Sequence, residues 1–122
     1  MTEKNFFNGM NRPVDAADLT EAEKKHVPVI VSPGSVKPGE PFEVSVTVGS
    51  IPHVMEPAHH IQWVELYAGE DFLARIAFTP GFTKASITLT VVLEAAGRAT
   101  LRVIERCNIH GLWESTRDIT VG

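Results

Sequence analysis

Short runs of alternating apolar and polar residues, divided by turns, limit most strongly how this chain can fold. The clearest run spans residues 42–48, where four apolar residues alternate with Glu43, Ser45 and Thr47. Successive side chains of a strand point to opposite faces, so this pattern predicts a strand with one buried face and one wet face. The run from Lys84 to Leu93 has the same period.

The same reading predicts seven strands, at residues 27–31, 42–48, 59–68, 72–78, 84–93, 100–105 and 114–121. Residues 32–41 contain three prolines and two glycines, and are predicted to form a turn. Strands at a spacing of roughly 8 to 12 residues, with no long amphipathic helix after residue 25, are typical of a two-sheet sandwich. We therefore predict an all-β, immunoglobulin-like antiparallel sandwich.

The first part of the chain has a different pattern. Residues 1–22 show no sustained period and are predicted to form an N-terminal arm, followed by one domain at residues 23–122. Asp15 to Lys25 is predicted as one short helix that Asp15 caps, because acidic residues occupy its first turn. Phe6 and Phe7 are candidates for a contact between subunits.

Composition excludes several classes of function. A net charge of -4 argues against a nucleic-acid partner, because binding phosphates needs a basic face. No stretch approaches the ~18 apolar residues of a membrane span, and the N-terminus has no apolar run of signal-peptide length. The single cysteine, Cys107, cannot form an intrachain disulfide, so a cytoplasmic location is expected.

The cysteine and the histidines all lie at predicted loops or strand boundaries. They are Cys107, His26, His53, His59, His60 and His110. A lone buried cysteine, with histidines that are merely hydrogen-bonded, is the simplest interpretation. However, sandwich loops gather at the ends of the fold, so these groups can meet at one metal ion. One thiolate with several imidazoles suits zinc, copper or iron; the absence of a methionine after Met55 disfavours blue copper.

Three separated segments, Lys25–Pro28, His53–Trp63 and Cys107–Trp113, resemble the superoxide reductases. The resemblance runs from near Glu23 to the end of the chain. It is to the one-iron form, the neelaredoxins of the desulfoferrodoxin family. The two-iron members carry an additional N-terminal four-cysteine iron domain, for which this sequence has no cysteines.

The resemblance implies one mononuclear non-haem iron per chain, which reduces superoxide by one electron to hydrogen peroxide. By position in the motifs, the equatorial ligands would be His26, His53, His59 and His110, and the axial thiolate would be Cys107. It also implies rubredoxin or a similar small electron donor, and a homo-oligomer, either a dimer or a tetramer. His60 adjoins a ligand but would face the other way.

The chain departs from the family pattern directly before His26. The family has glutamate and then lysine there, whereas this chain has Lys24 and Lys25, with Glu23 one position further away. Lys25 is therefore the expected catalytic residue, and Glu23 and Lys24 are further candidates. A site that works without the carboxylate is the favoured interpretation. Two alternatives remain: a non-catalytic iron or copper electron-transfer protein on the same sandwich, and an interaction module without a metal.

Overall fold

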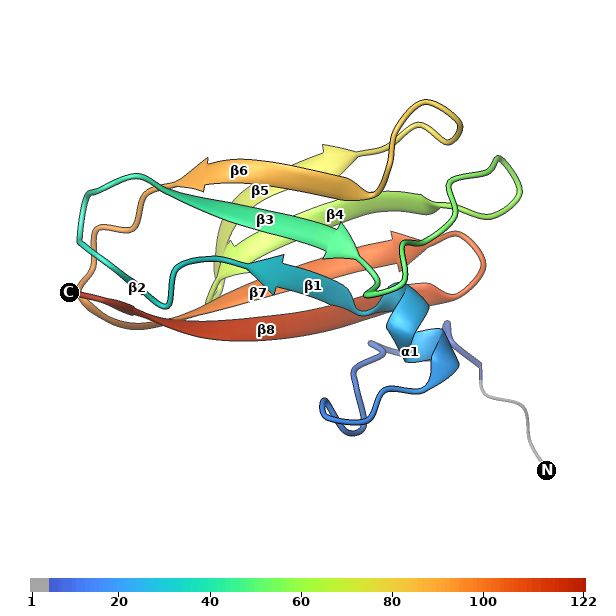
Figure 1. Cartoon of the computed structure of the whole chain (residues 1–122), viewed down its shortest axis with the longest axis horizontal. Coiled ribbons are helices and arrows are strands. Elements are labelled where there is room, and N and C mark those ends of the chain that lie inside the picture. The colour runs from blue at the N-terminus through green and yellow to red at the C-terminus, as the bar shows by residue number, and fades with distance from the viewer. Residues whose placement is uncertain (1–4) are drawn as a thin grey trace.

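Two β-sheets pack face to face in the computed structural model of the chain, which describes residues 5–122 (Figure 1). The first sheet has the order β1-β3-β6, with β1 (Pro28–Val31), β3 (Phe42–Val48) and β6 (Ser86–Val91). The second has the order β2-β8-β7-β4-β5, with β2 (Ser35–Val36), β4 (Ile61–Ala68), β5 (Asp71–Ala77), β7 (Gly97–Cys107) and β8 (Gly111–Val121). Every pairing is antiparallel except the parallel pair β2–β8. The predicted all-β sandwich is confirmed.

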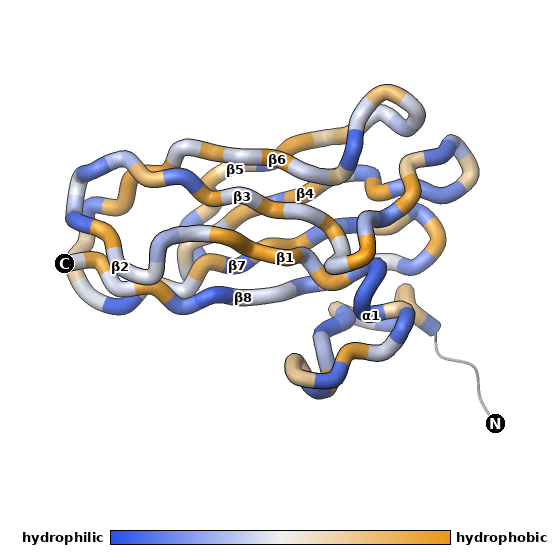
Figure 2. The backbone as a smooth tube through the Cα atoms, in the orientation of Figure 1, coloured by the Kyte–Doolittle hydropathy of each residue, from blue (hydrophilic) through white to orange (hydrophobic). Residues whose placement is uncertain are grey.

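The core lies between the sheets and follows the alternation in the sequence. On β3 every second residue, from Phe42 to Val48, is buried. Leu101 and Val103 of β7 and Leu66 of β4 are fully buried opposite them. Figure 2 shows the same alternation of hydrophobic and hydrophilic segments along β3. Burying one such side chain contributes about 1.5–3 kcal/mol to the free energy of folding. The packed core therefore stabilises the strands whose ends carry the loops.

The described residues form eight strands where seven were predicted, and most strand ends differ from the prediction by one to three residues. Ser35 and Val36, inside the predicted turn, form β2 by pairing with the last residues of β8. A two-residue strand between prolines and glycines has no period that a pattern could reveal. The third predicted strand begins at Ile61 instead of residue 59, because Glu56 and His59 form a local bridge of their own.

The helix α1 (Glu21–His26) is shorter than predicted, and Asp15 does not cap it. The cap is Thr20: its Oγ1 accepts the Glu23 N–H at 3.2 Å, and Glu23 Oε1 accepts the Thr20 N–H at 2.8 Å. This reciprocal capping box fixes the start of the helix, while the Asp15 side chain accepts the N–H of Ala17 in a local turn. Within residues 5–122 no helix is long and apolar enough to cross a lipid bilayer.

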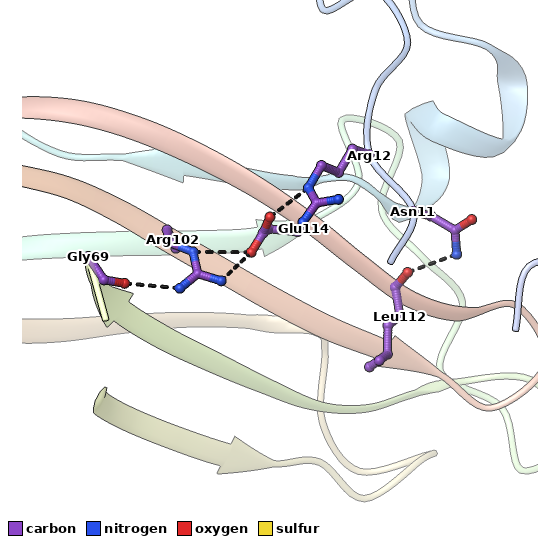
Figure 3. Close-up of polar contacts among 6 residues, drawn as sticks. All are labelled: Asn11, Arg12, Gly69, Arg102, Leu112 and Glu114. Carbon is purple, nitrogen blue, oxygen red and sulfur yellow. Dashed lines mark hydrogen bonds and ion pairs between the residues drawn. The ribbon is translucent and has the colours of Figure 1, made fainter. Parts of the chain in front are cut away.

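The segment before α1 is attached to the start of β8. Asn11 forms a parallel bridge with Trp113, and Arg12 Nε donates to Glu114 Oε1 at 2.8 Å. Arg102 Nη2 donates to the other oxygen of Glu114 at 2.7 Å, so one buried carboxylate joins two guanidinium groups (Figure 3). The division into an arm at residues 1–22 and a domain at 23–122 stays a prediction, and α1 spans that boundary.

Glu114→Gln should lower the free energy of unfolding by about 2 kcal/mol, because a neutral amide replaces the charge that Arg12 and Arg102 share in a buried position. Urea denaturation at neutral pH measures the loss. The matched control is Asp118→Asn on the same strand, whose partner Arg98 is 76% exposed. It should cost less, and equal losses in the two variants would contradict this account.

Candidate metal centre

Four potential metal ligands meet at the end of the sandwich where α1 lies (Figure 1). His26 is the last residue of α1, His53 lies between β3 and β4, His59 precedes β4, and Cys107 ends β7. One ligand atom from each lies within 4.8 Å of the other three. Since the four residues come from three distant parts of the chain, the packing of the sandwich assembles the group.

The end of α1 and the β3–β4 loop are tied together by the backbone. The N–H of Ile51 donates to the carbonyl of Lys24 at 3.0 Å. Gly49, at a φ of +85°, has no side chain, and a Cβ there would lie 2.8 Å from the Lys25 carbonyl oxygen. The glycine therefore lets the loop that carries His53 approach the helix end that carries His26.

His110, in the loop between β7 and β8, lies beside this group. Its Nδ1 is 3.7 Å from the sulfur of Cys107, as is the Nε2 of His53. Its ring centroid is 4.8 Å from that of His26 and 5.1 Å from that of His59. All five residues that the resemblance implies as ligands thus gather in one place, whereas the His60 Nδ1 contacts the Glu56 carbonyl at 3.2 Å.

The four imidazoles form a closed ring in the order 26, 53, 59, 110. Neighbouring centroids lie 4.5–5.1 Å apart, and neighbouring planes are inclined by 68–83°. The diagonal pair His26 and His59 is further apart, at 6.3 Å, and only 34° from parallel. Four nitrogens arranged in this way, with the sulfur of Cys107 beside them, could surround a single ion.

Hydrogen bonds orient two of the rings. The Nδ1 of His26 lies 2.7 Å from the Ala22 carbonyl oxygen, and the Nδ1 of His53 lies 2.6 Å from that of Val54. A ring that donates through Nδ1 presents Nε2 as the free ligand atom. In His26 and His53 the atom turned to the centre is therefore Nε2, whereas His110 turns Nδ1 toward the sulfur.

Two buried ring nitrogens at the centre are consistent with a bound metal ion. Among the described residues, the Nε2 atoms of His26 and His59 are buried and have no hydrogen-bond partner. An unsatisfied buried polar group costs about 1–3 kcal/mol, so two of them at one place would be destabilising without a ligand. A metal ion satisfies both nitrogens at once, and imidazole with thiolate is a donor set that transition metals take.

The loop around Cys107 holds the sulfur in place. Burial raises the pKa of the Cys107 thiol, and backbone N–H groups of Ile109 and His110 that donate to the sulfur lower it. Asn108 fixes the loop to the neighbouring segment: its Oδ1 accepts the His60 N–H at 2.9 Å, and its Nδ2 donates to the Ala58 carbonyl at 3.1 Å. These contacts give Asn108 a structural role that sequence reasoning missed.

Glu105 is the other residue that sequence reasoning missed. It is fully buried on the same face of β7 as Cys107, and neither carboxyl oxygen has a hydrogen-bond partner among residues 5–122. Burial raises its pKa well above the usual range, which favours the neutral acid. The signal was present in the sequence, because Glu105 occupies the inward position after Leu101 and Val103.

The three candidate catalytic residues have different surroundings. Glu23 is buried in the capping box, and its Oε2 also accepts the Val14 N–H at 3.1 Å. Lys24 pairs with Glu21 at 3.2 Å. Lys25 is exposed and near the centre: burial is the main cause that lowers the pKa of His59, and the positive charge of Lys25 adds to it.

Comparison with known proteins agrees with this geometry. The desulfoferrodoxin family profile matches residues 18–116. A putative superoxide reductase of Methanocaldococcus jannaschii is 42% identical over 115 residues, which cover 93% of this chain and 95% of the relative. A solved variant of the superoxide reductase (neelaredoxin) from Ignicoccus hospitalis superposes with a TM-score of 0.80 at 38% identity, over 93% of this chain and 94% of that one. A putative superoxide reductase of Thermotoga maritima gives 0.78 at 30% identity, over 100% of this chain and 99% of that one.

Metal-free protein should lose stability as the pH falls from 6.5 to about 4. Burial lowers the pKa of His26 and of His53 from 6.5 to about 4 in the folded chain. Between these values the unfolded chain binds more protons than the folded one, so stability is complete above 6.5 and is lost on acidification. Urea unfolding across this range measures it, and replacing both histidines by glutamine should flatten the loss. An unchanged slope in that double variant would contradict the assignment.

Proposed function

The chain belongs to the desulfoferrodoxin family, and on that premise we infer that it is an enzyme, a superoxide reductase. In this reaction one superoxide anion takes up one electron and two protons and leaves as hydrogen peroxide, with no dioxygen released. The observation that carries the proposal is the ring of four imidazoles beside a buried thiol, with two ring nitrogens that have no hydrogen-bond partner within residues 5–122.

The metal we propose is one mononuclear iron per chain. His26, His53, His59 and His110 would hold it through nitrogen and Cys107 through sulfur. When bound, the iron supplies the one-electron redox chemistry. The backbone N–H groups of Ile109 and His110 direct positive dipoles at the sulfur, which tunes how much negative charge the thiolate donates.

Lys25 is the residue that we propose to act on the substrate. Its exposed ammonium lies within electrostatic reach of His59, so it can attract an anion toward the centre and hold a proton there. Lys24 is the weaker candidate because its ammonium already pairs with the carboxylate of Glu21. Both oxygens of Glu23 already accept backbone N–H groups, which supports a site that works without that carboxylate.

A small electron-carrier protein such as rubredoxin is the partner we propose for re-reduction. Val54 and Ile109, each next to a proposed ligand, are 46% and 43% exposed and would offer apolar contact to such a carrier. A homo-oligomer, dimer or tetramer, is proposed on the family resemblance. The cytoplasm is the proposed compartment, because it keeps the Cys107 thiol reduced.

Iron-loaded protein supplied with electrons should yield one hydrogen peroxide for each superoxide consumed. Dismutation would yield one for every two, together with dioxygen, and a purely electron-transferring protein would consume no superoxide catalytically. Cys107→Ser should abolish the thiolate-to-iron charge-transfer absorption, since the oxygen of serine cannot replace the thiolate. Survival of both the absorption and the rate in this variant would show that the thiol is not a ligand.

Lys25→Ala should slow superoxide consumption about threefold at low ionic strength, because one charge at ~6 Å in water contributes about 0.7 kcal/mol of attraction. The dependence of the rate on salt should weaken as well. The matched control is Lys24→Ala, which removes the same charge at the neighbouring position. Lys24 already pairs with Glu21, so its loss should change the rate less. Stopped-flow rates that fall equally in the two variants would assign the effect to net charge alone.

A further inference from the structure

The segment before α1 reaches the metal centre through the ring of Phe6. This ring meets the imidazole of His110 edge to face, with centroids 5.4 Å apart and planes inclined by 84°. It also lies 5.5 Å from Trp113, which stacks on His26 at 4.9 Å with planes only 19° apart. One aromatic side chain of the arm therefore contacts one proposed ligand directly and a second through Trp113.

Backbone contacts hold Phe6 at that place. The Nδ2 of Asn11 donates to the carbonyl oxygens of Phe6 and Leu112, both at 2.8 Å. The main chain of Asn11 bonds to β8 in both directions, donating to Leu112 at 2.9 Å and accepting from Glu114 at 2.9 Å. Figure 3 shows Asn11 beside Leu112, with Arg12 reaching Glu114 next to it. The carbonyl of Phe6 is thus tied to the strand that follows His110.

Gly111 makes room for this contact. Its φ is +76°, and a Cβ there would lie 2.4 Å from the Phe6 carbonyl oxygen, so no side chain fits without moving the arm. The residue directly after His110 is therefore shaped to receive the backbone of Phe6. A loop that only had to turn between β7 and β8 would not need this close approach.

His110 needs support of a kind that His26 and His53 do not. Those two rings are oriented through Nδ1, which contacts a carbonyl oxygen of the adjoining backbone. His110 directs its Nδ1 toward the sulfur of Cys107, so a hydrogen bond at that atom cannot set its orientation. Packing against neighbouring rings helps to fix the plane of the imidazole: His26 and His59 lie beside it within the group of proposed ligands, and Phe6 packs on it from outside that group.

We propose that Phe6 is a positioning residue for His110, and that the N-terminal segment 5–12 thereby completes the metal centre. The proposal rests on the proposed function only through His110 being a ligand. Hydrogen-bond partners that orient metal ligands from outside the coordination sphere typically change metal affinity 10- to 100-fold when they are removed. Loss of an edge-to-face ring contact corresponds to a smaller change, of about 2- to 10-fold. Loss of the Phe6 ring should have this smaller effect.

The test compares Phe6→Ala with Phe7→Ala in the full chain. Phe7 is adjacent and 52% exposed, and its ring lies under Arg106 at 5.9 Å, which makes it a matched control. Zinc affinity, measured by competition with a chelator, should fall about 2- to 10-fold in Phe6→Ala and stay unchanged in Phe7→Ala. In zinc-loaded protein the ring-proton resonance of His110 should shift in Phe6→Ala alone, because the ring current of Phe6 is lost.

Two further substitutions at Phe6 separate the effect of the aromatic ring from an effect on folding. Phe6→Tyr retains the ring and should restore both the affinity and the environment of His110. If Phe6→Ala does not fold, Phe6→Leu removes the ring while keeping apolar volume and should show the same loss. Equal affinity and equal resonances in the Phe6 and Phe7 variants would overturn the positioning role. Neither measurement involves superoxide, so failure of the proposed activity in the unaltered protein is a separate result.

Discussion

The structure depends on bringing several imidazoles and one thiol together out of water. Nitrogen atoms buried without a partner are destabilising in a medium of low dielectric, and neighbouring rings at 4.5–5.1 Å disfavour protonation of one another. A bound transition metal turns the same arrangement into a favourable one, because each lone pair then has an acceptor. The valine-rich core of the sandwich fixes the strand ends from which the proposed ligands project.

Distant parts of the chain contribute residues to the proposed metal centre, and each part is held in place by its own local contacts. The capping box at Thr20 and Glu23 starts the helix that ends in His26, and Gly49 lets the loop of His53 come close to it. Asn108 joins the cysteine loop to the segment of His59. The arm adds a further attachment through Asn11 and Arg12. These separate hydrogen bonds and close contacts explain how loops, which are usually the mobile parts of a sandwich, can hold the proposed ligands at fixed angles.

Charge is distributed unevenly around the centre. The buried carboxyl of Glu105 lies on the face of Cys107, and burial favours its neutral form, so it adds little negative charge near the sulfur. The positive charge of Lys25 is at the surface, where an anionic substrate would arrive. The carboxylate of Glu114 has its own two arginines and is engaged in holding the arm. One exposed lysine thus faces the proposed metal centre of an acidic protein, beside the carboxylate of Glu56, which acts on His59 more strongly than Lys25 does.

The sequence by itself determined the class of fold, because the alternation along β3 and β6 is a local property of each strand. It also pointed to the residues that we propose as metal ligands, whose motifs resemble a known family. Tertiary structure alone decided which local signals prevailed: Thr20 displaced Asp15 as the cap, and β2 formed only because β8 lies beside it. It also decided that Phe6 meets His110 and that Glu105 has no partner among the described residues. The physical reason is that a periodic pattern reports how one segment divides between core and water, whereas contacts between residues a hundred positions apart depend on how complete strands pack.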